Sequence, residues 1–204
     1  MPIAPVLSGP ISHLLHRLRR HDHSGIADDS PVSSPYIIAF RSSAQTINTG
    51  QFTTVALDVT APPADESGLG LLEVVGSRVR IAARGTYLAS WRVTVVKTDN
   101  NPIDTADALV VGVLELLDAS YTRLFIPSQV SYQPKIPSNS AGRENLNVGA
   151  TVLVPVMSFM NLPCYLELKA LVWAPSLTQV NVFGNDTQRG YTHLHVVRVD
   201  GRVF

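Results

Sequence analysis

The sequence predicts an all-β protein, an antiparallel β-sandwich that follows an N-terminal extended or short helical tether. Between Ser77 and Val96 the chain has the pattern of a strand, a corner at Arg84–Gly85 and a second strand. From Tyr36 onward no stretch has convincing helical spacing of apolar residues, and polar turns separate many short apolar runs. Short strands joined by polar turns are typical of a sandwich or barrel.

The strand after Gly85 is the one around which we expect the sandwich to form. One side of it would carry Tyr87, Ala89, Trp91, Val93 and Val95, and the other Thr86, Leu88, Ser90, Arg92 and Thr94. Such alternation predicts a strand with one dry and one wet face. Glycine adopts positive φ at little cost, which a sharp corner at Gly85 would use.

The N-terminal residues 1–35 are predicted to be a tether and linker, ahead of a β-sandwich domain over 36–204. Four apolar residues fall on one side of a short helix over about 11–20: Ile11, Leu14, Leu15 and Leu18. A helix this short is marginal alone in water and needs a partner. We expect this apolar stripe to attach the protein to a larger assembly.

The remaining strands are expected wherever apolar runs lie between turn residues. They are Tyr36–Ser42, Thr53–Val59, Leu71–Val75, Ser77–Ala82, Ala108–Leu117, Thr122–Ile126, Val148–Met160, Tyr165–Trp173, Thr178–Phe183 and Thr192–Val199. The segment Pro127–Asn147 is predicted to be a long polar loop, and loops of that length are usually functional or mobile.

Two expected strands, Ala108–Leu117 and Val148–Met160, are apolar on both sides. A sandwich strand needs only one dry face, so something must cover the other. A loop or second layer is one explanation; we favour burial against copies of the same chain. The second face of Val148–Met160 supplies Leu153, Met157 and Phe159 as candidate interface residues. Pro155 indicates an irregular or edge position.

Composition excludes several classes of protein. Sixteen basic residues balance sixteen acidic ones, so no net field attracts nucleic acid. One cysteine, Cys164, excludes an intramolecular disulfide. No apolar run approaches the roughly 20 residues that span a bilayer, and no secretory signal is visible. We therefore expect neither nucleic-acid binding nor membrane insertion, and synthesis in a cytoplasm.

The order of features resembles the tumour-necrosis-factor and complement globular-head family. The residues that carry the resemblance are Ile38-Ala39-Phe40, Gly85-Thr86-Tyr87-Leu88-Ala89-Ser90 and the closing strand Tyr191–Val199. Ala89 stands where the family usually has Phe, and Trp91 would fill that space. The resemblance implies a jelly roll that assembles as a homotrimer, with His193 and His195 near the oligomer axis.

The segment His21-Asp22-His23-Ser24-Gly25-Ile26-Ala27-Asp28-Asp29 resembles a linker of tailed-bacteriophage structural proteins, where it precedes a fibre or spike domain. This chain continues with Ser30-Pro31 instead of the further Asp-His of that linker. The resemblance implies a virion protein, placed on the capsid surface and made in the host cytoplasm, with the major capsid protein as a partner.

All six histidines occur in close pairs. His21 and His23, repeated around a three-fold axis, would offer six imidazoles to an iron or nickel ion. His193 and His195 would suit a cupin-type metal site, although that site also needs a glutamate and a further histidine. The alternative is that both pairs are ordinary surface or interface residues. We expect no other cofactor.

No nucleophile elbow, phosphate loop or His-Glu-x-x-His motif occurs, so we expect no enzyme. The leading hypothesis is a trimeric capsid decoration protein, of the cement or head-spike kind, that attaches through its N-terminal arm and stabilises or decorates the shell. One alternative is the receptor-binding tip of a tail or head fibre, with Tyr121, Tyr132, Arg123 and Lys135 at the contact surface. A second alternative is a cupin-type jelly-roll enzyme.

Overall fold

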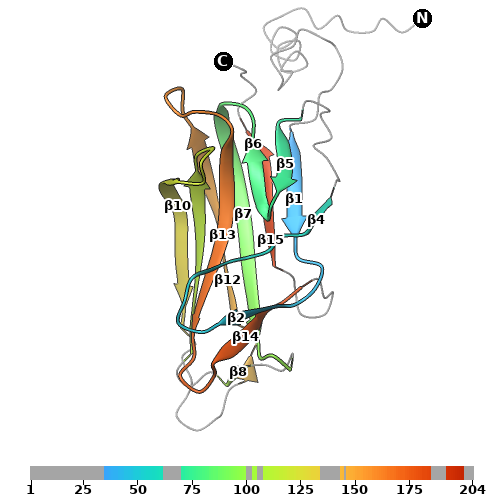
Figure 1. The fold of residues 1–204 in the computed structure, drawn as a ribbon, viewed down its shortest axis with the longest axis vertical. Helices are drawn as coiled ribbons and strands as arrows, with labels where there is room; N and C mark the ends of the chain where they lie inside the picture. The colour runs from blue at the N-terminus through green and yellow to red at the C-terminus, as the bar shows by residue number, and fades with distance from the viewer. Residues whose placement is uncertain are drawn as a thin grey trace, which may run out of the picture.

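The computed structural model describes residues 35–61, 70–99, 103–104, 108–133, 143–144, 146–184 and 192–199. These residues form an elongated sandwich of two β-sheets with long strands running nearly parallel to its long axis (Figure 1). The described ranges contain no helix that is long and apolar enough to cross a membrane. The expected helix and its residues Ile11, Leu14, Leu15 and Leu18 lie outside the described residues, as do His21 and His23.

One layer, here called sheet A, is built around a central strand. Its hydrogen-bonded order is β2 (Gln45–Asn48), β14 (Gln179–Val182), β7 (Gly85–Val96), β15 (His193–Arg198), β1 (Tyr36–Phe40) and β4 (Val59–Ala61), and β12 (Leu146–Val156) pairs with the other edge of β7. All of these pairs are antiparallel.

The second layer, sheet B, is also antiparallel. Its order is β10 (Arg123–Tyr132), β9 (Leu109–Leu117), β13 (Cys164–Trp173), β6 (Arg78–Ile81) and β5 (Leu72–Val75), and β3 (Thr53–Thr54) pairs with β13. A separate short ladder joins β8 (Ile103–Asp104) to β11 (Arg143–Glu144). Consecutive strands therefore change sheets repeatedly, as between β6 and β7.

The predicted central strand is confirmed. Strand β7 pairs with β12 along one edge and with β15 and β14 along the other. Its predicted dry side chains all face the core and are 2% exposed or less: Tyr87, Ala89, Trp91, Val93 and Val95. Gly85 opens the strand with φ of 148°, a conformation that side-chain-bearing residues rarely adopt. The alternation of apolar and polar residues therefore fixed which face enters the core.

The predicted loop Pro127–Asn147 is wrong at its beginning, because β10 continues as far as Tyr132. The prolines suggested a loop since proline cannot donate a ladder hydrogen bond. Here Pro127 lies within a register irregularity between Phe125 and Ser128, on a strand at the edge of sheet B. Edge positions and bulges are where a sheet tolerates proline.

The expectation that copies of the chain cover the second face of Ala108–Leu117 is also wrong. Strand β9 is central in sheet B, between β10 and β13. Its outward residues Val111, Val113 and Leu117 are already buried within the chain. Side chains of the flanking strands enclose them, with Lys169 opposite Val113 in the register. The second apolar face of β12 has a different environment, described next.

Candidate functional site

The outward face of sheet A carries a row of apolar side chains that crosses four strands. In the strand register Leu153 of β12 lies opposite Leu88 of β7, Leu88 opposite Val197 of β15, and Val197 opposite Tyr36 of β1. We call these four residues the apolar band. Leu153 is 57% exposed, and beyond the end of β12 Met157 and Phe159 are 44% and 79% exposed. The other three residues of the band are half-buried, so the described residues leave chiefly Leu153 and the turn after β12 uncovered.

Three of the five residues predicted to form a subunit interface lie on this face, and the other two follow the end of β12. Leu153 points outward from β12, and His193 and His195 point outward from β15, two strands away. Met157 and Phe159 fall in the turn that follows β12, not on the strand as predicted. The fold thus gathers residues that lie about 40 positions apart in the sequence. Their role in assembly stays a prediction.

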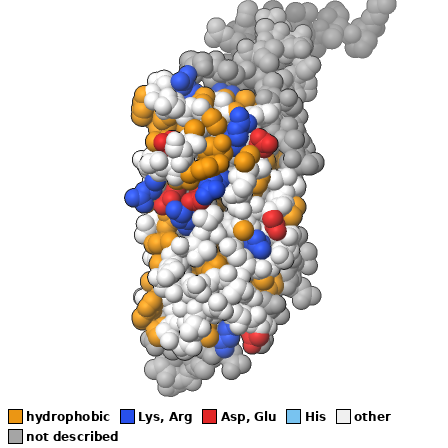
Figure 2. Space-filling model, viewed as in Figure 1, with side chains coloured by type: hydrophobic (Ala, Val, Ile, Leu, Met, Phe, Trp, Pro, Cys, Tyr) orange, Lys and Arg blue, Asp and Glu red, His pale blue; other side chains and the backbone are white. Residues whose placement is uncertain are grey.

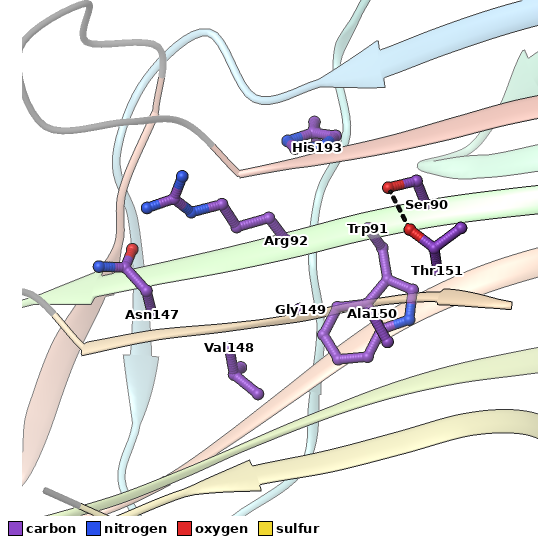
Figure 3. Close-up of a pocket in the computed structure, with 9 residues that line it drawn as sticks. All are labelled: Ser90, Trp91, Arg92, Asn147, Val148, Gly149, Ala150, Thr151 and His193. Atoms are coloured by element: carbon purple, nitrogen blue, oxygen red, sulfur yellow. Dashed lines mark hydrogen bonds between the residues drawn. The ribbon is translucent and has the colours of Figure 1, made fainter.

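Beside the apolar band the same face is hollowed. The depression has a volume of about 380 Å³ and is lined by Ser90, Trp91, Arg92, Asn147, Val148, Gly149, Ala150, Thr151 and His193. Figure 3 shows β7 and β12 side by side with most of the lining residues, and His193 on the neighbouring strand β15. The hydroxyls of Thr151 and Ser90 bond to each other at 3.0 Å across the two strands. The lining therefore combines polar and apolar groups in similar measure.

Gly149 creates the depression. It lies opposite Arg92 in the β7–β12 ladder and is exposed. A β-carbon at this position would lie 2.5 Å from the carbonyl oxygen of Trp91 and 3.3 Å from the Cα atom of Arg92. These are backbone atoms of a central strand, which do not yield easily. The close approach of β12 to β7 thus requires glycine, and the missing side chain leaves the floor open.

Arg92 is the charged side chain of this depression. It is half-buried and projects outward from the central strand β7. In Figure 3 its side chain extends away from the Ser90–Thr151 pair, toward the end where Asn147 lies. Asn147 accepts a hydrogen bond from the Thr94 hydroxyl at 2.8 Å, which orients its amide. Among the described residues Arg92 has no hydrogen-bond or ion-pair partner.

His195 lies between the depression and the apolar band. Its ring meets the Tyr36 ring edge-on, with centroids 6.2 Å apart and an interplanar angle of 85°. Burial lowers the pKa of His195 from its usual 6.5, because a partly desolvated imidazole resists protonation. At neutral pH its side chain is therefore an uncharged part of this face.

No protein-family model matches the sequence, and no curated protein matches it. Among solved structures, the chain resembles the Eiger tumour necrosis factor of S. frugiperda with a TM-score of 0.55 and 10% identity, covering 82% of this chain and 95% of that one. Murine APRIL superimposes with a TM-score of 0.47 and 12% identity, covering 80% and 99%.

The chain has a tumour-necrosis-factor-like jelly-roll fold. The predicted fold class is thereby confirmed, since the Eiger likeness spans most of both chains and the described elements are antiparallel strands in two sheets. At 10% identity the likeness shows the fold alone. Functions of a jelly roll reside in sites placed on it, so they must be argued from this chain's own residues.

The jelly roll presents no metal centre in its described ranges. No three His, Cys, Asp or Glu side chains converge there on a common point. His193 and His195 share the outward face of β15, where their neighbours in the ladder are Arg92 and Ser90 of β7. No carboxylate or third imidazole joins this pair within the described residues, so the chain's arrangement there differs from what a cupin-type site needs.

Sheet B of the jelly roll carries a charged cluster that the sequence did not reveal. The Lys169 ammonium lies 2.7 Å from Glu115 and 3.1 Å from Glu167, two carboxylates that are almost fully buried. Arg78 contacts Glu167 at 2.5 Å, and Arg123 contacts Glu115 at 3.4 Å. Figure 2 shows acidic and basic side chains gathered at one side of the face that it presents. Three basic side chains therefore surround two buried carboxylates.

An aromatic pair adjoins the charged cluster. Tyr121 has φ of 60°, unusual for a residue with a side chain, and its ring lies 4.9 Å from that of Tyr165. The Arg78 guanidinium stands 4.6 Å from the centre of the Tyr121 ring. Stacking and cation–π attraction offset the cost of the left-handed backbone. No sequence pattern indicated these contacts, because Tyr121 resembles an ordinary turn residue.

Proposed function

We propose that this chain is the subunit of a homotrimeric structural protein that decorates the capsid of a tailed bacteriophage. The observation that carries the assembly is the apolar band on sheet A, in which Leu153 is exposed and the other three residues are half-buried, together with the exposed Met157 and Phe159. Contiguous apolar surface on a soluble domain marks an interaction site, because its contact with water is unfavourable. Copies of the same chain are the occupants that the jelly-roll resemblance supports.

The polar chemistry of the face agrees with a subunit contact. The apolar band lies beside hydroxyls, imidazoles and an arginine, and a mixture of apolar centre and polar surround is usual for protein interfaces. In the assembly Leu153, His193 and His195 are buried between copies. In a closed ring of three copies each contact is heterologous, so this face of one subunit meets a different surface of the next.

Capsid attachment is supported by the N-terminal sequence. The linker His21–Asp29 resembles those of phage structural proteins, and the stripe Ile11, Leu14, Leu15 and Leu18 needs a partner to be stable. In this proposal residues 1–30 grip the shell of major capsid protein while the jelly roll stands on the outside. The trimer then stabilises the shell or presents a knob at the capsid surface.

The test of assembly is the native mass of the full chain, with two glutamate variants for comparison. Phe159→Glu places a charge in the exposed turn after β12 and should yield monomers. Phe52→Glu is the control, because Phe52 is another exposed phenylalanine, at 52%, but precedes β3 of sheet B. A monomeric wild-type protein, or trimers that tolerate Phe159→Glu as well as Phe52→Glu, would contradict the proposed interface.

The test of capsid attachment is to mix the purified protein with capsids that lack it. Binding that is saturable and lost on deletion of residues 1–30 is the expected result. Retained binding after this deletion would count against the N-terminal arm, and no binding at all would count against capsid decoration.

A receptor-binding fibre tip is the second candidate, and the exposed side chains of the Tyr121 turn and β10 favour it. Tyr121 and Tyr132 are 48% and 39% exposed, and Arg123 between them is largely in solvent. Exposed aromatic residues next to charged groups are common in recognition surfaces. Binding to whole host cells or to a glycan array, lost in Tyr132→Ala, would favour this function over decoration.

A further inference from the structure

An unpaired positive charge occupies the middle of the face that we propose is covered by a second copy. Arg92 projects from the central strand of sheet A, opposite Gly149 on one side and His193 on the other. Its guanidinium has no hydrogen bond or ion pair to any residue in the part of the chain that the structure describes. Leu88 of the apolar band stands one outward position beyond Ser90 on the same strand, so a surface that covers the band also covers Arg92.

The described carboxylates of the same chain do not supply the missing charge. Glu115 and Glu167 are held by Lys169 on sheet B. Asp58 accepts hydrogen bonds from the backbone and side chain of Ser42, beyond the end of β1. Residues of the depression that flank Arg92 are neutral amides, hydroxyls and His193. The charge is therefore uncompensated within the described face.

Covering an uncompensated guanidinium is energetically unfavourable. A charge taken out of water without a partner costs several kcal/mol, whereas a well-placed carboxylate recovers most of that cost. The guanidinium is planar and pairs with a carboxylate through two parallel hydrogen bonds. The cavity beside it, about 380 Å³ and opened by Gly149, has room for the end of an acidic side chain.

We propose that the depression between β7 and β12 is a carboxylate-binding site, in which Arg92 receives an Asp or Glu side chain of a second copy of this chain. This inference rests on the proposed assembly through sheet A. It adds that the interface is held by a buried charge pair as well as by the apolar band. A charge pair of this kind sets the register of the copies, because it forms only where the carboxylate lies opposite Arg92.

The deciding experiment replaces Arg92 by methionine, which has similar length and no charge, in the full chain. If a neighbouring carboxylate faces Arg92, Arg92→Met leaves that carboxylate buried and unpaired. Assembly should then weaken, with the concentration at half-dissociation rising at least about 100-fold. If nothing acidic faces Arg92, the same variant removes a buried unpaired charge, and assembly should be unchanged or stronger. The sign of the effect therefore decides.

The measurement is sedimentation equilibrium over a range of protein concentration, with circular dichroism to confirm that each variant folds. Arg80→Met is the matched control, because Arg80 pairs with Glu73 at 3.3 Å at the surface of sheet B. It should leave assembly unchanged. Arg92→Lys keeps the charge without the planar fork and should fall between wild type and Arg92→Met.

The possible failures are distinguishable. A wild-type protein that stays monomeric overturns both the proposed assembly and this pair. A trimer that Arg92→Met leaves intact or strengthens overturns the carboxylate site alone. A third outcome is that the wild-type protein assembles only with added inorganic phosphate, whereas Arg92→Met assembles without it. This result would assign the depression to a free anion and would overturn the proposal that a second copy supplies a carboxylate.

Discussion

The indole ring of Trp91 occupies the place that a side chain at Gly112 would need. A β-carbon built on Gly112 would lie 2.3 Å from Cζ3 and 2.5 Å from Cη2 of that ring. Trp91 projects inward from β7 of sheet A, and Gly112 lies on β9 of sheet B. Trp91, the largest fully buried side chain of the core, thus fits because Gly112 on the opposite sheet has no side chain. This contact constrains how the two sheets pack.

Gly112→Ala is therefore expected to destabilise the fold by about 1–3 kcal/mol, because the added methyl overpacks a core that cannot expand freely. Urea unfolding measures the change. Trp91→Phe removes the ring atoms that would clash, so the double variant should cost less than the two single variants added together. Strict additivity, or a neutral Gly112→Ala, would show that the ring does not fill this space in solution.

Lys169 holds two buried carboxylates, so its removal should be costly. Lys169→Met is expected to lose about 3 kcal/mol at neutral pH, since Glu115 and Glu167 would remain buried without their shared cation. Arg123→Gln serves as the control and should change stability by less than about 1 kcal/mol, because Arg123 is mostly exposed. Equal effects of the two variants would contradict a central role for Lys169.

The dependence of the unfolding free energy on pH in the alkaline range tests the same cluster. Burial lowers the pKa of Lys169, but hydrogen bonds to Glu115 and Glu167 and their charges outweigh it, so the net pKa lies above 10.5. A raised pKa means that the contribution is complete below pH 10.5 and is lost as pH rises through the folded-state value. Wild-type protein should therefore lose stability in that range, and Lys169→Met should lack this loss.

His195 should make stability depend on pH on the acid side. Because burial lowers the pKa of His195, the unfolded chain binds a proton that the folded chain resists. Its contribution is complete above pH 6.5 and declines as pH falls through the lower folded-state pKa. His195→Asn should flatten the slope of unfolding free energy against pH in this window. An unchanged slope would show that the ring is not desolvated as described.

The ring of Tyr121 is expected to compensate for its backbone conformation. Asparagine tolerates the left-handed region, so Tyr121→Asn tests the ring without adding backbone strain. Loss of the contacts with Tyr165 and Arg78 should cost about 1–2 kcal/mol. Tyr121→Phe keeps the ring and should stay within about 0.5 kcal/mol of wild type. A more stable Tyr121→Asn would mean that the strain is not offset by these contacts.

Local patterns predicted the strands well where each strand's own residues decide its conformation. The five core-facing positions after Gly85 are confirmed, whereas Thr94 of the predicted wet face is also buried. Pro155 correctly indicated an edge, because β12 pairs only with β7 among the described strands. Strand β2 was missed. Its residues Gln45–Asn48 are mostly polar, and they form a strand because β14 offers a ladder. The Gln45 side chain also bonds to the backbone of Thr54 and Ala56.

The second apolar faces of β9 and β12 show a limit of sequence patterns. The residue pattern of each strand predicted an apolar face that a single chain leaves uncovered. Only β12 has such a face in the structure. Strand β9 is flanked by two long strands whose side chains cover it, whereas β12 lies at the edge of sheet A. The composition of a strand does not reveal how many neighbours it acquires, because these come from distant parts of the chain.

The sequence by itself determined the class of fold, the central strand and which of its residues enter the core, because side-chain alternation is a property of adjacent residues. The tertiary structure alone decided which apolar faces stay exposed, where the charged cluster forms and that Gly149 opens a depression beside Arg92. These features depend on the pairing of strands that are far apart in sequence, and their register is set by packing across the whole sandwich.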